Sequence, residues 1–157
     1  MVKVSLKGVH MTTTARRSVT TVAGTVALLL TASGCGSSSS QTTKVTQSEW
    51  IFTADPTTAK AGKVTISAKN LGGFEHEVVL VKAADPKELA MKADGSVDEE
   101  KITEAQKVGE VEHIAPNSSK KNTFTLEAGK YVMFCNLVEK DGTSHFAKGM
   151  SGTFTVT

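Results

Sequence analysis

The sequence predicts an all-β sandwich with one helical insertion, and three observations support this prediction. Apolar and polar residues alternate over several short segments, which is the periodicity of half-buried strands. Glycine and proline residues that favour turns separate these segments. The chain has 157 residues, which is long enough for one domain with a single hydrophobic core. Hydrophobic residues make up 39% of it and charged residues 22%, a composition that is typical of a globular domain.

Six segments are expected to form strands. The first should bury Trp50 or Phe52. The third is an apolar, β-branched run that is typical of a buried strand, and the turn at residues 70–73 separates it from the second strand. The expected strands are residues 45–53, 63–69, 77–81, 121–126, 131–134 and 152–156.

Residues 85–107 interrupt the strand pattern, and we expect one or two short helices there. Asp85 followed by Pro86 is typical of a helix N-cap with proline in the first turn. Ser96 and Glu99 have the spacing of a capping box, and residues 99–107 suit a helix. The charges of this insertion are interpreted as a solvated face.

The first 34 residues have the features of a cleaved export signal. Arg16 and Arg17 precede an apolar stretch over residues 19–30, which is shorter than the roughly 20 residues that span a bilayer. Small residues at 32–34 then lead to Cys35. This arrangement resembles the lipobox of bacterial lipoproteins, in which the cysteine is lipidated and becomes the mature N-terminus. The alternative is an ordinary secreted protein in which Cys35 is incidental.

The segment after the signal is polar and rich in serine and threonine. Residues 35–43 are therefore expected to be the lipidated cysteine and a flexible tether, and residues 44–157 the folded domain. Lipidation would place the protein at the outer face of the cytoplasmic membrane or in the periplasm. The domain is expected to be a monomer.

The charge distribution argues against nucleic acid as a partner. The chain has 18 basic and 16 acidic side chains, and four of the basic ones, but no acidic one, lie in residues 1–34. The remaining 14 basic side chains against 16 acidic ones give the rest of the chain a net charge of −2, and none of its residues is arginine. Nucleic-acid binding surfaces are basic.

Four side chains carry the candidate chemistry. Cys135 follows an expected strand, His145 and Met150 lie between that strand and the last one, and His76 precedes a buried strand. A thiolate, two imidazoles and a thioether form a donor set that suits copper cycling between Cu(I) and Cu(II). A lone thiol in an exported domain also needs an explanation, which metal ligation provides; a disulfide between Cys35 and Cys135 is the alternative.

These residues, in this order on a strand-rich pattern, resemble the type 1 blue-copper proteins of the cupredoxin family, in particular plastocyanin-like and sulfocyanin-like domains. The resemblance implies a Greek-key sandwich and one copper ion bound by His76, Cys135, His145 and Met150. Nine residues separate Cys135 from His145, where most relatives have about two to four. A binuclear copper centre is excluded, because it needs two cysteines and residues 135–150 contain one.

Two further candidates are interpreted as structural. Met133 has the same strand parity as Cys135 and is expected in the core. His113 lies beside a turn at residues 115–117 and is not expected to bind the metal.

The resemblance implies an electron carrier and not an enzyme. A redox donor and a redox acceptor would bind transiently, and His145 is expected to expose its ring edge as the electron port, surrounded by Phe146, Ala147 and Gly149. The alternative is a copper-binding lipoprotein for delivery, storage or resistance. The scattered methionines Met91, Met133 and Met150 favour the carrier, since storage sequences tend to have Met-rich or His-rich tracts.

Overall fold

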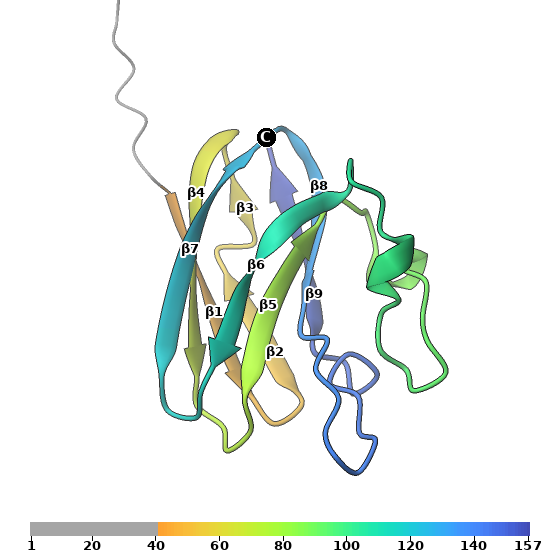
Figure 1. The fold of residues 1–157 in the computed structure, drawn as a ribbon. Helices are drawn as coiled ribbons and strands as arrows, with labels where there is room; N and C mark the ends of the chain where they lie inside the picture. Colours follow the sequence, from red (N-terminus) through yellow and green to blue (C-terminus); the bar gives the residue numbers. More distant parts are fainter. Residues whose placement is uncertain (1–40) are drawn as a thin grey trace, which may run out of the picture. The chain divides into compact units, whose positions relative to one another are not determined.

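The computed structural model describes residues 41–157, and it shows the predicted all-β sandwich (Figure 1). The expected signal peptide, Cys35 and the tether up to residue 40 lie outside the described residues. Within residues 41–157, the structure has no helix with the length and hydrophobicity needed to cross a bilayer.

Two mixed sheets pack face to face. The four-stranded sheet has the order β2-β1-β4-β7 and the five-stranded sheet has the order β3-β9-β8-β5-β6. Neighbouring strands are antiparallel except for the pairs β1–β4 and β3–β9. The first sheet consists of β1 (Gln41–Ser48), β2 (Ile51–Asp55), β4 (Gly62–Asn70) and β7 (Ser119–Leu126), and the second of β3 (Thr58–Ala59), β5 (His76–Val81), β6 (Lys107–Ile114), β8 (Gly129–Phe134) and β9 (Ser151–Val156).

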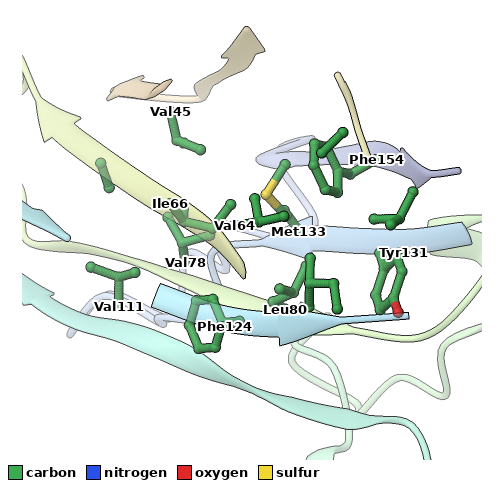
Figure 2. Packing of buried hydrophobic residues seen from close by; sticks show 14 of the residues in the cluster. Val45, Val64, Ile66, Val78, Leu80, Val111, Phe124, Tyr131, Met133 and Phe154 are labelled. Atoms are coloured by element: carbon green, nitrogen blue, oxygen red, sulfur yellow. The ribbon is translucent and has the colours of Figure 1, made fainter. Parts of the chain in front are cut away.

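The core lies between the sheets and follows the alternation in the sequence. In β4, Val64, Ile66 and Ala68 are fully buried, whereas the residues between them are more exposed. These side chains meet those of β5 and β8, including Leu80 and Met133 (Figure 2). The assignment of Met133 to the core is therefore confirmed.

Strand β5 is buried on both faces, which explains its unbroken apolar sequence. Val78 and Leu80 belong to the core between the sheets. Val79 and Val81 belong to a second cluster on the other face, together with Val97 of the insertion. The insertion therefore covers the face of β5 that would otherwise lie in water.

The helices predicted within residues 85–107 are reduced to two single 3-10 turns, η1 (Pro86–Glu88) and η2 (Glu99–Lys101). The Asp85 cap is confirmed, since its carboxylate accepts a hydrogen bond from the Lys87 amide over 2.8 Å. The prediction of a capping box at Ser96 is wrong, because the Ser96 hydroxyl donates a hydrogen bond to the Asp94 carboxylate instead. Packing against β5 and the start of β6 at Lys107 leave no room for a longer helix.

The strands differ from the prediction in three main respects. The expected first strand is a hairpin, β1–β2, because Trp50 adopts the left-handed conformation with φ of 62° and reverses the chain. Strand β1 begins at Gln41, so the sheet includes three residues that were expected in the tether. Strands β3 and β6 were not predicted, since β3 has only two residues and β6 contains register shifts.

A buried asparagine holds the turn that leads into β5. The Asn70 amide donates to the carbonyl oxygens of Phe74 and Ile114 over 2.6 and 2.9 Å, and its oxygen accepts from the Gly72 amide over 2.8 Å. This turn directly precedes His76, the first residue of β5. Asn70 therefore fixes the position of the first candidate ligand.

We expect Asn70→Ala to lower the free energy of unfolding by about 3 kcal/mol, because it leaves buried backbone groups without partners. Asn122→Ala is the matched control, since the exposed Asn122 amide donates only to the Glu110 carbonyl, and it should cost less than about 0.5 kcal/mol. Urea denaturation measures both values. Equal effects of the two substitutions would contradict the role of Asn70.

Candidate metal centre

Three of the four predicted ligands meet at one end of the sandwich. His76 is the first residue of β5, Cys135 directly follows β8, and His145 lies in the loop between β8 and β9. The Nδ1 atoms of the two histidines are 3.1 Å apart. The Cys135 Sγ atom lies 3.2 Å from Nδ1 of His145 and 3.8 Å from Nδ1 of His76. The structure thus gathers one sulfur and two imidazole nitrogens around a common point.

The separations between these donor atoms fit a single metal ion. Thiolate and imidazole ligands lie about 2.0–2.3 Å from a first-row metal ion, so three of them in a trigonal plane are roughly 3.5 Å apart. The observed separations of 3.1, 3.2 and 3.8 Å bracket that value. One thiolate and two imidazoles in a trigonal arrangement are typical of a type 1 copper site.

The centre is shielded from water, and two of its donors, His76 and Cys135, are uncharged at neutral pH without a metal. His76, Cys135 and His145 are each 0% exposed. Burial, with a smaller contribution from the neighbouring His145, lowers the pKa of His76 to about 4. Burial raises the pKa of the Cys135 thiol to about 12. At neutral pH a metal ion would therefore meet a neutral His76 and would have to displace the thiol proton.

Met150 is fully buried on the same loop. Its carbonyl oxygen accepts from the Cys135 amide over 3.0 Å, and its amide donates to the His145 carbonyl over 3.1 Å. Among the described residues, Met133 belongs to the core between the sheets, whereas neither hydrophobic cluster contains Met150. Its role as the axial ligand stays a prediction.

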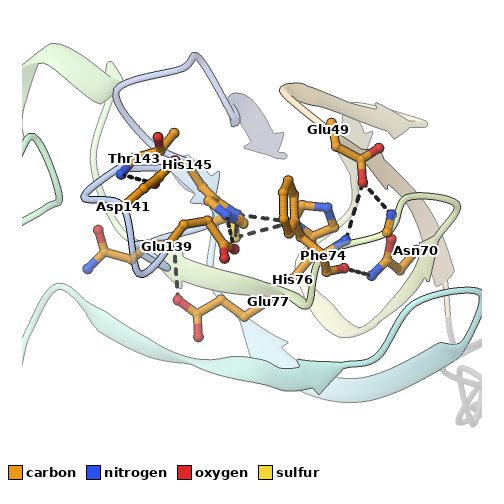
Figure 3. A network of polar contacts seen from close by, with 12 residues as sticks. Glu49, Asn70, Phe74, His76, Glu77, Glu139, Asp141, Thr143 and His145 are labelled. Atoms are coloured by element: carbon orange, nitrogen blue, oxygen red, sulfur yellow. Dashed lines mark hydrogen bonds and ion pairs between the residues drawn. The ribbon is translucent and has the colours of Figure 1, made fainter.

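The long segment between Cys135 and His145 forms an ordered hairpin. Val138 and Ser144 form an isolated antiparallel bridge. The Glu139 amide donates to the Thr143 carbonyl over 2.9 Å, and the Asp141 carboxylate accepts from the Thr143 amide over 2.9 Å. The hairpin brings Glu139 to His145, whose Nε2 lies 2.9 Å from a Glu139 carboxylate oxygen (Figure 3).

The prediction that His145 exposes its ring edge is wrong. Glu139 covers Nε2, and the Trp50 ring meets the imidazole edge to face at 5.4 Å between centroids. The Phe74 ring lies 6.3 Å from the imidazole and is 40% exposed. Phe146, which was expected beside an exposed port, is buried against Phe134. The physical reason is the loop length, because the extra residues fold over the imidazole.

The insertion, residues 85–107, contacts the loop between β8 and β9, which is called the ligand loop below. The Asn136 amide donates to the Val97 carbonyl over 3.0 Å and to the Glu99 carboxylate over 2.7 Å. The Ser144 hydroxyl donates to the Gly95 carbonyl over 2.9 Å. Gly95 has φ of 81°, and a Cβ atom there would lie 2.9 Å from that of Ala147, so only glycine fits this contact.

A half-buried carboxyl links the two ligand-bearing segments. Glu77 follows His76 in β5, and its carboxylate accepts a hydrogen bond from the backbone amide of Asn136 over 3.0 Å. Burial raises the pKa of Glu77 to about 7. The sequence did not single out Glu77, Asn136 or Glu139, because glutamate and asparagine are common on any protein surface and no spacing marks these three.

His113 lies apart from the centre, as expected. Its Nδ1 pairs with the Glu75 carboxylate over 2.9 Å, and Glu75 raises the pKa of this exposed histidine. The group of potential metal ligands found in residues 41–157 consists of His76, Cys135 and His145.

The fold is similar to those of solved copper proteins. No protein-family model matches the chain, and no curated protein matches it in sequence. Reduced auracyanin from the photosynthetic bacterium Roseiflexus castenholzii is 24% identical, with a TM-score of 0.54 over 75% of this chain and 98% of that chain. Auracyanin A, a "blue" copper protein from the green thermophilic photosynthetic bacterium Chloroflexus aurantiacus, is 22% identical, with a TM-score of 0.52 over 76% and 100%.

An azurin, Az-iso2 of the obligate methylotroph Methylomonas sp. strain J, is 21% identical, with a TM-score of 0.51 over 76% of this chain and 99% of that chain. Auracyanins and azurin are cupredoxins, and their nearly complete coverage means that the shared region is the whole sandwich. The chain therefore has the cupredoxin fold that its sequence predicts, with a His–Cys–His group that fits a type 1 copper site.

Proposed function

We propose that this protein is a single-copper electron carrier, tethered to a membrane through a lipid on Cys35. The observation that carries the proposal is the convergence of Cys135 Sγ with the Nδ1 atoms of His76 and His145 at one buried point. Copper bound there would supply one-electron chemistry by cycling between Cu(I) and Cu(II). An electron carrier makes and breaks no bonds of a substrate, so we do not propose an enzyme.

The chain's own residues contribute a fixed and dry set of donors. The Cys135 and Met150 backbones are hydrogen-bonded to each other, and His145 is bonded to Glu139 at one ring nitrogen. Donors held in this way change position little when the charge of the ion changes. A small rearrangement of ligands is what rapid one-electron transfer requires.

Burial of the donors favours a carrier over a copper-delivery protein. Delivery requires that a partner's ligands reach the ion and replace those of the donor protein. His76, Cys135 and His145 are 0% exposed, and the ligand loop is closed by its own hairpin and by the insertion. This arrangement supports retention of the ion.

Electrons would leave through an aromatic pair instead of His145 itself. Trp50 contacts the His145 ring, and its own ring lies 6.0 Å from that of Phe74. Phe74 is 40% exposed, so the pair connects the buried imidazole to the protein surface. Donor and acceptor proteins would therefore bind over the β1–β2 and β4–β5 turns. Redox encounters of this kind use small, weak interfaces.

The short length of chain between Cys35 and β1 supports an outward-facing centre. Five residues separate Cys35 from Gln41, so the sheet can lie at most about 20 Å from a lipid on Cys35. Strand β1 runs from Gln41 to Ser48, a length of about 25 Å, and Trp50 follows at its far end beside His145. With a lipid on Cys35, the metal centre would thus lie at the end of β1 away from the anchor.

The Cys135 thiolate should give the copper form its colour. We expect the Cu(II) protein to show an intense visible charge-transfer band that Cys135→Ser abolishes, because the serine hydroxyl is not a charge donor of comparable strength. Absorption spectra of both proteins with added Cu(II) test this, and circular dichroism checks the fold. Retention of the band in Cys135→Ser would contradict the site.

Met150 should tune the centre without being required for it. A weak axial thioether sets the potential of such sites, so Met150→Leu should keep copper and colour but raise the reduction potential, since loss of a donor disfavours Cu(II). Met133→Leu is the matched control, because Met133 lies in the core between the sheets, and it should leave the potential unchanged. Protein-film voltammetry measures both. An unchanged potential in Met150→Leu would exclude Met150 as a ligand.

The lipid on Cys35 should determine where the protein is found. The wild-type protein should begin at Cys35 after processing and partition with membranes into detergent. Cys35→Ser removes the acylated sulfur, so the protein should be released from membranes or remain unprocessed. Fractionation and mass spectrometry of the mature N-terminus check this prediction. An unmodified N-terminus at another residue would exclude the lipoprotein.

A further inference from the structure

We infer that Glu139 is a positioning residue of the metal centre: its carboxylate fixes the His145 imidazole in the tautomer that directs the Nδ1 lone pair at the metal. The effect on a metal rests on the proposed copper function, whereas the effect on the imidazole does not. This role also explains the nine residues between Cys135 and His145, because the longer segment brings a carboxylate to Nε2 of His145.

The contact between the two side chains is close and largely shielded. His145 Nε2 lies 2.9 Å from Oε1 of Glu139. The imidazole is 0% exposed and the carboxylate side chain is 26% exposed. Water therefore competes little for this hydrogen bond, and a charge-assisted bond in such a setting is stronger than one on an open surface.

The chemistry of the two groups determines where the proton lies. An ionised carboxylate only accepts hydrogen bonds, so Nε2 of His145 must be the donor and carry the proton. In a neutral imidazole the other nitrogen, Nδ1, is then a bare acceptor. That nitrogen lies 3.2 Å from the Cys135 sulfur and faces the common point of the donors. Glu139 thus holds His145 in the form that can bind a metal ion.

The hairpin holds the backbone of Glu139 in a fixed position. Glu139 donates its amide hydrogen to the Thr143 carbonyl and accepts at its carbonyl from the Gly142 amide, each over 2.9 Å. The His145 amide donates to the Leu137 carbonyl over 2.9 Å, which closes the hairpin next to the ligand. The two side chains therefore lie on one closed unit of backbone, and their distance does not depend on another element.

The second histidine has no such support. Nε2 of His76 is buried and has no hydrogen-bond partner among residues 41–157. The two imidazoles are thus unequal: one has an anionic partner behind it and the other does not. Outer hydrogen bonds of this kind orient metal-binding histidines and raise their basicity, and their loss costs about 10–100-fold in metal affinity. An effect of Glu139 should accordingly be confined to His145.

The test compares Glu139→Gln and Glu139→Ala in the purified full-length protein, with Glu104→Gln as a control for charge on an exposed residue. Long-range ¹H–¹⁵N NMR of metal-free protein with ¹⁵N-labelled histidine reports the tautomer of each ring. Titration with Co²⁺, whose thiolate charge-transfer band is visible, reports metal affinity. Voltammetry of the copper form reports the reduction potential.

In the wild type we expect His145 to be protonated at Nε2 in the absence of metal. Glu139→Gln retains an acceptor oxygen, so the tautomer should persist and the Co²⁺ affinity should stay within about threefold. Glu139→Ala should mix the tautomers of His145 alone and weaken Co²⁺ binding roughly 10-fold or more. Both variants remove a negative charge near the ion and should raise the reduction potential. Glu104→Gln should change none of these properties.

A single Nε2-protonated tautomer and unchanged Co²⁺ affinity in Glu139→Ala would overturn the inference. If Glu139→Ala does not fold, a metal-free wild-type protein in which His145 is protonated at Nδ1, or populates both tautomers, overturns it equally. Failure of the proposed function looks different: the wild type would bind neither Co²⁺ nor copper, while the tautomer of His145 would still depend on Glu139.

Discussion

The constraint on which this structure depends is the removal of a thiol and two imidazoles from water at one point. Each of these groups loses hydration on burial, and a polar group without a partner is costly to bury. The side chains compensate through the contacts of His145 Nδ1 with Cys135 Sγ and with His76 Nδ1, and through the contact of His145 Nε2 with Glu139. Among the ring nitrogens of these two histidines, only His76 Nε2 is left without a partner in the described residues. A site that keeps such a cost is typical of function, because a purely structural core would replace these residues with apolar ones.

Strand β5 links this centre to the rest of the sandwich. It begins with His76 and pairs with β8, which ends just before Cys135, so the ladder from Val79–Phe134 to Val81–Val132 sets the spacing of the two ligand-bearing ends. The insertion covers the outer face of β5 and reaches the ligand loop through Asn136. One packed unit thus supports both the strand and the loop. The insertion is therefore part of the architecture of the centre, although its sequence carries no ligand.

The sequence was sufficient for most of the strands and for three of the side chains that meet at the candidate centre. Alternation in residues 63–69 and the apolar run at 77–81 predicted β4 and β5, because a half-buried and a fully buried strand leave different patterns. The order of His76, Cys135 and His145 predicted a metal centre that the structure assembles. Capping signals at Ser96 predicted a helix that tertiary packing replaces with a 3-10 turn. The burial of His145 was not predictable, since it depends on the register of a loop hairpin that no periodicity encodes.

The length of the ligand loop changes what kind of surface the centre presents. A short loop would leave the outer edge of the histidine at the surface, where it would be both a ligand and a contact with partners. Here the hairpin and the Glu139 carboxylate occupy that edge, and Trp50 and Phe74 lie between the imidazole and solvent. In the proposed carrier, binding of the ion and contact with partners would thereby be assigned to different side chains. The contacts that hold the ligands would then be independent of the surface that meets a partner. The exposed aromatic residues could vary without a change in the ligands.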